Sequence, residues 1–211
     1  EILKYGSEKA EKNIVTSLVY TLTEFKTIKD VKILINGYAV KKLKYGTDVS
    51  GVLNRGNILI NNDRINLKEG FDKTDIYAFK TVNDNFFYLL PVSVDFEGTG
   101  NKSLPGRIVE LLGSQPKDGF LYSEIPQDTK LIGYSISSNL LTLNFDAELL
   151  NYGGTTREQG MLDQIVHSMK QLEGVEWVRI LIDGKRAHLV EGTDISKDIS
   201  VTGEINDVID R

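Results

Sequence analysis

Two histidines, His167 and His188, are the first side chains to consider for acid–base chemistry, because the ordinary histidine pKa lies closest to neutral pH. Neither histidine has a second histidine or a cysteine nearby at the spacing of a metal site. General acid–base catalysis also needs a convergent partner group, and the sequence indicates none. We therefore expect structural or surface roles for both histidines.

Carboxylates offer a second kind of chemistry, with Asp146 and Glu148 as a candidate hydrolytic pair. The carboxyl groups of glycosidases lie about 5–9 Å apart in space, and closeness along the chain does not test that separation. Glu1 and Glu148 recur in two similar stretches, and Asp48 and Asp194 recur in the motif GTD. Acidic side chains that recur in this way favour a shared structural role, such as capping the following turn. We predict no catalytic residue.

The glycine-rich stretch EGTGNKS at 97–103 lacks the G-x-x-x-x-G-K-[ST] spacing of a phosphate-binding loop. The chain has no cysteine, which excludes disulfides, thiolate metal sites and cysteine nucleophiles. We therefore predict no cofactor and no metal.

The charge and the apolar runs of the chain limit the kinds of partner that we expect it to bind. The net charge is −5 and the pI is about 5.2, and no dense stripe of Lys and Arg is interleaved with aromatic residues, so we predict no nucleic-acid binding. No apolar run approaches the roughly 20 residues that cross a bilayer. A hydrophobic share of 40% and a charged share of 26% are typical of soluble globular proteins.

The elements that would position these residues occur twice. EILKYG at 1–6 matches ELLNYG at 148–153, and VKILINGYAV at 31–40 matches VRILIDGKRA at 178–187, both displaced by 147 residues. GTDVS at 46–50 matches GTDIS at 192–196 with a displacement of 146. Between them lie two helical patterns whose apolar positions also differ by 147: Ile14, Val15, Leu18, Val19, Leu22 and Phe25, then Met161, Leu162, Ile165, Val166, Met169 and Leu172. The chain contains an internal duplication.

The second copy predicts the order β-β-α-β-β-α-β-β over residues 73–200. Ser103 is the expected N-cap of its first helix, and Thr155 with Glu158 has the spacing of a capping box for the second. Asp183–Gly184, like Asn36–Gly37, favours a tight hairpin turn. The fold class is α+β, with two helices packed on one face of a mainly antiparallel sheet.

The first copy contains only the back half of this pattern. We assign residues 1–52 to that half copy, 53–72 to a linker with a β-hairpin, 73–200 to the complete second copy and 201–211 to a C-terminal tail. The apolar stripe of the first helix must pack on the second copy, on another chain or on residues 57–67, because burial of each side chain contributes about 1.5–3 kcal/mol. We expect this chain to be a fragment that begins inside its first domain.

At LYSEIPQDTKLIGYSI, LNFDAELLNYGGTTRE and VRILIDGKRA…GTDIS the chain resembles the GerM family (GerMN, or Germane, domains) of sporulation and spore germination proteins. The resemblance covers residues 73–200, with a truncated copy in 1–52. It implies tandem modules similar to ring-building motifs, in a lipid-anchored extracytoplasmic protein between the mother-cell and forespore membranes. Its lipid anchor would lie outside this chain. NGY at 36–38 departs from the DGK at 183–185.

Three residues are candidates for partner binding. Phe120 and Tyr122 lie in the polar loop 113–129, where apolar side chains are either tucked under the loop or offered to a partner. Trp177 replaces Asp30 of the first copy and lies on the opposite face from Val178.

We hypothesise a non-catalytic scaffold that binds other extracytoplasmic sporulation proteins or itself and supports the mother cell–forespore channel. A module for cell-wall glycan or a small ligand is the alternative, with Tyr88, Tyr122 or Tyr134 lining a pocket. A cell-wall hydrolase is a weaker alternative.

Overall fold

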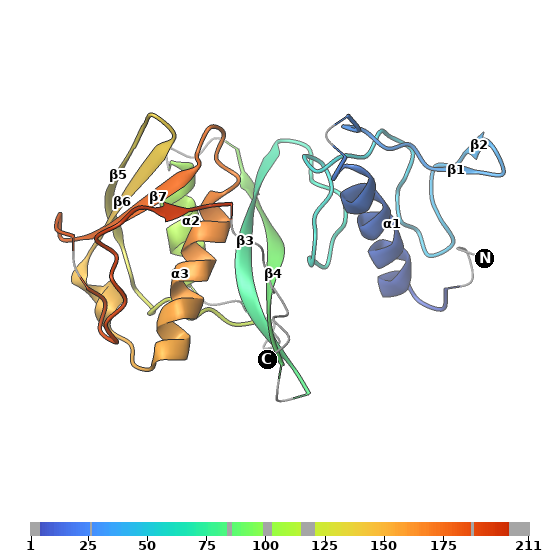
Figure 1. Cartoon of the computed structure of the whole chain (residues 1–211). Coiled ribbons are helices and arrows are strands. Elements are labelled where there is room, and N and C mark those ends of the chain that lie inside the picture. The colour runs from blue at the N-terminus through green and yellow to red at the C-terminus, as the bar shows by residue number, and fades with distance from the viewer. Residues whose placement is uncertain are drawn as a thin grey trace. The chain divides into compact units, whose positions relative to one another are not determined.

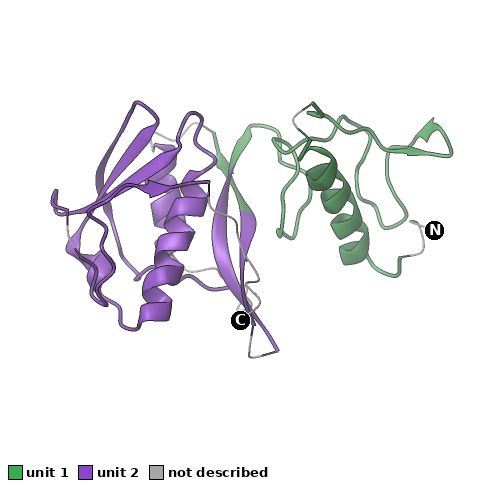
Figure 2. Cartoon of the chain, in the orientation of Figure 1, with its two compact units in different colours: residues 1–73, 93–99 green, residues 74–92, 100–211 purple. Residues whose placement is uncertain are grey.

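The computed structural model describes residues 5–25, 27–83, 86–98, 103–114, 121–186 and 188–202. The chain divides into two compact units, and we describe each by itself (Figure 2). Unit 1 comprises residues 1–73 and 93–99, and unit 2 comprises residues 74–92 and 100–211. Unit 1 thus contains the first copy, residues 53–73 and also residues 93–99, which lie within the stretch 73–200 assigned to the second copy.

Unit 1 is built around α1 (Glu8–Leu22), whose N-cap Ser7 accepts a hydrogen bond from the Ala10 N–H (Figure 1). One side of α1 packs into a core cluster whose buried members are Val15, Val19, Val49, Leu53, Ile58 and Ile65. The predicted hairpin is present but short, with β1 (Leu34–Ile35) antiparallel to β2 (Tyr38–Ala39). Asn36 and Gly37 both take positive φ in its turn, as expected for this dipeptide.

Residues 53–72, expected as a linker with a hairpin, contribute to the core of unit 1. Ile58 and Asn66 form an antiparallel bridge, and Leu59 donates its N–H to Ile65 at 2.7 Å. Ile58 has no exposed surface and contacts the α1 cluster. Of the three partners considered for the α1 stripe, this local segment covers the Val15 and Val19 side.

Unit 2 contains a four-stranded sheet in the order β5 (Leu131–Ser137), β6 (Leu140–Phe145), β7 (Trp177–Ile182) and β8 (Ile199–Ser200). β5 with β6 and β7 with β8 are antiparallel, whereas β6 and β7 are parallel. Leu141, Leu143 and Phe145 on β6 are fully buried and alternate with half-buried residues. One face of this sheet therefore forms the core of unit 2.

Two helices cover this core, α2 (Leu104–Gly113) and α3 (Thr155–Met169), and they lie against each other (Figure 1). A short 3₁₀ helix, η1 (Ala147–Leu150), precedes α3. Ser103 caps α2 as predicted, accepting the Gly106 N–H. The capping box predicted at Thr155 and Glu158 is wrong. The N-cap of α3 is Gly154, and Glu158 is fully buried and accepts hydrogen bonds from a distant loop.

The strand expected after Asp183–Gly184 is also absent from the described residues. Ile182 and Lys185 form a single bridge across the turn, and the chain then leaves the sheet. The ladder position beside β7 is taken instead by β8, where Val178 pairs with Ile199. A turn dipeptide sets the direction of the chain for two residues, but strand pairing beyond it depends on distant segments.

β3 (Phe71–Val82) and β4 (Phe86–Glu97) form a separate two-stranded sheet rather than part of the main one. The reason lies in α3, whose polar side chains bind the main chain of β3. Gln164 Nε2 donates to the Tyr77 carbonyl at 2.8 Å, and Ser168 Oγ accepts the Tyr77 N–H at 2.9 Å. Gln171 accepts the Asp75 N–H at 3.1 Å and donates to the Asp75 carbonyl at 2.6 Å. Side chains of α3, and of Gln171 just beyond its end, thus bind the main chain of an edge that another strand would otherwise pair.

We predict that Gln164→Ala lowers the free energy of unfolding by about 2–4 kcal/mol, because the Tyr77 carbonyl and the Glu124 N–H both lose their partner in a buried setting. Urea denaturation measures this. The matched control Gln127→Ala removes an exposed glutamine and should change stability by less than about 0.5 kcal/mol. Equal effects of the two substitutions would contradict the role given to Gln164.

Candidate functional site

The most concentrated polar cluster of unit 2 surrounds Glu158, in the first turn of α3. Its Oε2 accepts the Glu191 N–H at 2.7 Å and the Tyr152 hydroxyl at 2.6 Å, and its Oε1 accepts the Thr193 N–H at 3.0 Å. Gly192 lies between the two N–H donors at φ +99°, a left-handed conformation that favours glycine. The carboxylate therefore fastens α3 to the loop that carries the second GTD motif.

Unit 1 repeats this arrangement at Glu11, the residue equivalent to Glu158. Glu11 Oε2 accepts the Tyr45 N–H at 2.7 Å and Oε1 accepts the Thr47 N–H at 2.9 Å. Gly46, between these donors, has φ +93°. Both glutamates have no exposed surface. We call each arrangement a carboxylate latch: Glu11 with residues 45–47, and Glu158 with residues 191–193.

The hydrogen bonds of each latch stabilise the ionised form of its glutamate carboxyl group. Burial alone would raise the pKa of the Glu11 carboxyl, but the hydrogen bonds from Tyr45 and Thr47 outweigh burial and lower this pKa to about 2. The pKa of Glu158 is lowered in the same way, against burial, by bonds from Thr193, Tyr152 and Glu191. Burial and the neighbouring carboxylate raise the pKa of Tyr5 in unit 1 and of Tyr152 in unit 2. These are properties of a structural anion and not of a proton donor near neutral pH.

The carboxylates singled out in the sequence bind the backbone or neighbours close by. Asp146 accepts the Lys130 N–H at 3.0 Å, and Glu148 accepts the Asn151 side-chain amide at 2.7 Å. Asp48 accepts the Ser50 N–H at 2.9 Å, and Asp194 accepts the Ser196 N–H at 2.8 Å. The bonds of Glu148, Asp48 and Asp194 span two or three residues and stabilise turns, whereas the bond of Asp146 joins two segments sixteen residues apart. Glu1 lies outside the described residues.

The two histidines lie in opposite environments. His167 is buried in α3 beside Tyr77, with ring centroids 5.6 Å apart, and burial lowers its pKa. The His188 side chain is 70% exposed and lies 4.0 Å from Asp194. Among the described residues, no group of three or more His, Asp or Glu side chains converges in the way that metal ligands do.

Of the three residues predicted to bind a partner, Phe120 lies outside the described residues. Tyr122 is half-buried, exchanges two backbone hydrogen bonds with Phe79 and stacks on its ring at a centroid distance of 5.8 Å. Trp177 is 45% exposed at the start of β7, whereas Val178 beside it is fully buried. Tyr122 is thus held against Phe79 of β3, whereas Trp177 belongs to the start of β7.

The edge strand β5 presents an apolar surface that the sequence reading missed. Tyr134 and Ile136 lie opposite the buried residues Leu143 and Leu141 of β6, so they share the core-facing side of the sheet. They are nevertheless 45% and 49% exposed, because β5 is the last strand of its sheet. We call residues 131–137 with these two side chains the β5 edge. Such an edge offers main-chain hydrogen bonds and apolar contacts together.

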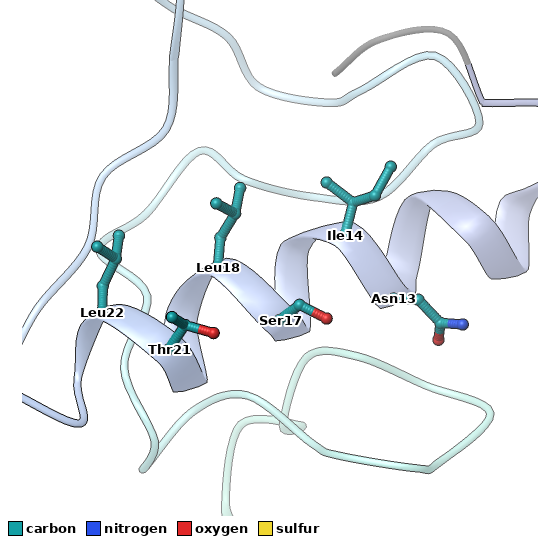
Figure 3. Close-up of a pocket in the computed structure, with 6 residues that line it drawn as sticks. All are labelled: Asn13, Ile14, Ser17, Leu18, Thr21 and Leu22. Atoms are coloured by element: carbon teal, nitrogen blue, oxygen red, sulfur yellow. The ribbon is translucent and has the colours of Figure 1, made fainter. Parts of the chain in front are cut away.

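A second apolar surface lies along α1 (Figure 3). Ile14, Leu18 and Leu22 point the same way from the helix and line a groove of about 430 Å³. Asn13, Ser17 and Thr21 form the adjacent polar row of the same groove. We call these six residues the α1 face. Ile14 and Leu18 are half-buried and Leu22 is 37% exposed, so the side of α1 away from Val15 and Val19 remains open within unit 1.

A groove of unit 2 runs between α2 and residues 127–131, with a volume of about 700 Å³. Gly106 and Gly113 of α2 contribute to its lining, together with Glu110 and Lys130. Neither this groove nor the α1 groove is lined by Tyr88, Tyr122 or Tyr134. The aromatic glycan pocket considered from the sequence is therefore found in neither.

Comparison with known proteins agrees with this architecture. The chain matches the Germane family, described as sporulation and spore germination, over residues 2–41 and 76–188. This protein belongs to the Germane family. It is 27% identical to the spore germination protein GerM of Bacillus subtilis strain 168 over an alignment of 221 residues. The alignment covers 98% of this chain and 58% of GerM. The chain thus spans little more than half of that curated relative.

The fold also matches a solved structure, the tandem GerMN domains of the sporulation protein GerM from Bacillus subtilis. The TM-score is 0.73 at 23% identity, and the match covers 94% of this chain and 70% of that one. The α+β fold predicted from the sequence pattern and the tandem GerMN modules implied by the family resemblance are both confirmed. In the part of the chain that the structure describes, no helix is long and apolar enough to cross a bilayer.

We predict that Glu158→Gln lowers the free energy of unfolding at pH 7 by about 2–4 kcal/mol, because an amide cannot accept all of the bonds that the carboxylate accepts. The folded-state pKa is depressed, so this contribution is present above the ordinary glutamate pKa and is lost as pH falls through the folded-state value. The difference from the wild type should therefore shrink as pH falls below about 4.

Urea denaturation at several pH values measures this difference. The matched control is Glu173→Gln, which removes an exposed charge beyond the end of α3 and should have little effect at any pH. A destabilisation by Glu158→Gln that does not change with pH would contradict the latch.

Proposed function

We propose that this protein is a non-catalytic, extracytoplasmic scaffold of sporulation or spore germination that supports the channel complex between mother cell and forespore. Membership of the Germane family supports a role in sporulation or spore germination, and the name of the Bacillus subtilis relative agrees with that role. A lipid anchor outside this chain would hold the scaffold at a membrane, and its partners would be other extracytoplasmic sporulation proteins or further copies of itself.

The observation that carries the proposal is the β5 edge. It combines seven residues of edge strand with Tyr134 and Ile136, two large apolar side chains that are about half exposed. Proteins that bind an extended segment of a partner use this combination, in which main-chain bonds supply affinity and side chains supply selectivity. The sheet face behind the edge is a packed core, so the edge is held rigidly by β6 through the pairs Tyr134–Leu143 and Ile136–Leu141.

The use of the carboxylates also favours binding over catalysis. The most strongly bound ones, Glu11 and Glu158, accept backbone N–H groups in the latches. Asp146 accepts the backbone N–H of Lys130, and Glu148 stabilises a turn through Asn151. A glycoside hydrolase needs one carboxyl group with a raised pKa and a second one about 5–9 Å away. Glu158, the most enclosed acid of unit 2, instead has a lowered pKa. Burial raises the pKa of Glu124 and of Asp163, but Glu124 is ion-paired with Arg157 at 3.5 Å and Asp163 lies on an exposed position of α3.

We predict that a photo-crosslinking phenylalanine analogue placed at Tyr134 captures extracytoplasmic proteins in sporulating cells of the source organism. The double substitution Tyr134→Ser with Ile136→Ser should abolish sporulation or germination function while the protein level stays normal. The matched control is the same analogue at Tyr38, which is 77% exposed in unit 1.

Equal capture at Tyr134 and Tyr38, or full function of the double variant, would contradict a role for the β5 edge. Release of soluble fragments from purified cell walls, abolished by substitution of a single carboxylate, would instead establish a hydrolase and overturn the proposal.

A further inference from the structure

The four-stranded sheet of unit 2 has a second face, opposite the buried one, and Trp177 and Arg179 of β7 lie on it. Val178 and Ile180 alternate with them along the strand and are buried in the core. Leu140 of β6 pairs with Trp177 across the sheet. We call this side of the sheet the outer face of unit 2. The Trp177 ring is 45% exposed there and is available for contact.

Two arginines close to Trp177 share one carboxylate. Arg179 Nε and Nη2 donate to the two oxygens of Asp198 at 2.7 and 2.8 Å, and Arg186 Nη2 lies 3.4 Å from Asp198 Oδ1. Hydrogen bonds from Arg179 lower the pKa of Asp198, which therefore carries its negative charge at neutral pH. In the described part of the chain, Arg186 makes no other hydrogen bond, and its side chain is 40% exposed. The cluster thus holds two positive charges against one negative charge.

Unit 1 has the same strand pairing without this cluster. Its bridge between Val31 and Leu53 is equivalent to the pair Val178–Ile199 of β7 and β8. The positions of the cluster are occupied in unit 1 by other residues: Asp30 for Trp177, Lys32 for Arg179, Ala39 for Arg186 and Val52 for Asp198. Asp30 accepts a hydrogen bond from the Asn54 side chain at 2.9 Å. The module therefore folds without the cluster, and its first copy has a carboxylate where the second has the tryptophan.

The chemistry of the cluster favours an acidic partner with an apolar group. A guanidinium group binds a carboxylate through two parallel hydrogen bonds, and an aromatic ring beside it can pack on an apolar side chain. Tryptophan and arginine are also the residues most enriched at the energetic centres of protein interfaces. The cluster lines neither groove described above, so it offers a surface rather than an enclosed site. A net charge of −5 repels long polyanions, which favours a short acidic segment.

We propose that the outer face of unit 2 binds a short acidic segment of a protein partner. A carboxylate of the partner binds Arg186 and the exposed part of Arg179, and a neighbouring apolar side chain packs on the Trp177 ring. The choice of a protein as the partner rests on the proposed scaffold function, whereas the acidic chemistry rests on the arginines. This surface is distinct from the β5 edge, because Tyr134 and Ile136 lie on the core-facing side of the sheet.

Trp177 is the single tryptophan of the chain, so its fluorescence reports on this surface alone. The probe is a synthetic peptide of two Glu-Leu-Glu-Gly repeats with blocked ends, titrated into the 211-residue chain at low salt. Two control peptides carry glutamine or lysine in place of glutamate.

We expect a saturable change in Trp177 fluorescence with a Kd below about 1 mM for the acidic peptide and no change with either control peptide. Arg186→Gln should raise this Kd at least about fivefold and leave the fold intact, because Arg186 makes one long contact at the surface. Sodium chloride at about 0.5 M should also weaken binding, since salt screens exposed charges. The matched control Arg157→Gln removes an arginine of similar exposure from α3 and should not change the Kd.

No saturable response, an equal response to the glutamine peptide, or an unchanged Kd for Arg186→Gln would overturn the proposal. Tighter binding of polygalacturonate than of the peptide, at equal carboxylate concentration, would overturn the choice of a protein and assign the surface to an anionic polysaccharide. The β5 variant Tyr134→Ser with Ile136→Ser should keep the full peptide response, so failure at either surface is detected separately.

Discussion

Each unit depends on one buried carboxylate that fastens a helix to a glycine loop. Glu11 and Glu158 accept two backbone N–H groups each, from residues that flank Gly46 and Gly192. A charge buried without such donors would cost far more than a protein of this size can offset, so the loop must take the one conformation that aims both N–H groups at the carboxylate. That requirement explains why glycine, with positive φ, stands in both loops. It also ties the start of each helix to the segment that follows the turns at 36–37 and 183–184.

The equivalent helices α1 and α3 share this latch but have different surroundings. In unit 2 the polar row of α3 binds β3, and its apolar row is fully buried. In unit 1 the helix is latched to its own loop in the same way, but its outer rows are open within the unit. Duplication has thus kept the internal constraint, while the surfaces of the two units differ. Of these surfaces, the β5 edge is the one that the proposed scaffold role uses.

The sequence predicted the features that depend on neighbouring residues. The helical periods, the Ser103 cap and the positive φ angles at Asn36–Gly37 and Asp183–Gly184 all arise from interactions over a few positions. The parallel pairing of β6 with β7 and the replacement of the expected last strand by β8 depend on segments far apart in the chain, which periodicity does not relate. The spacing of Thr155 and Glu158 predicts a capping box, yet the two backbone N–H groups that Glu158 accepts lie more than thirty residues away. The displacement of 147 residues that links Glu11 to Glu158, read together with the repeated GTD loops, was the signal that could have identified both latches.

Carbon-13 NMR of the side-chain carboxyl groups of Glu11 and Glu158 during an acid titration tests the latch most directly. The account predicts that Glu11 stays ionised until the pH approaches about 2 and that Glu158 also titrates below the ordinary glutamate range. Titration of both carboxyl groups at the ordinary glutamate value, near pH 4.3, would contradict the account, because it would mean that the buried N–H groups do not stabilise the charge.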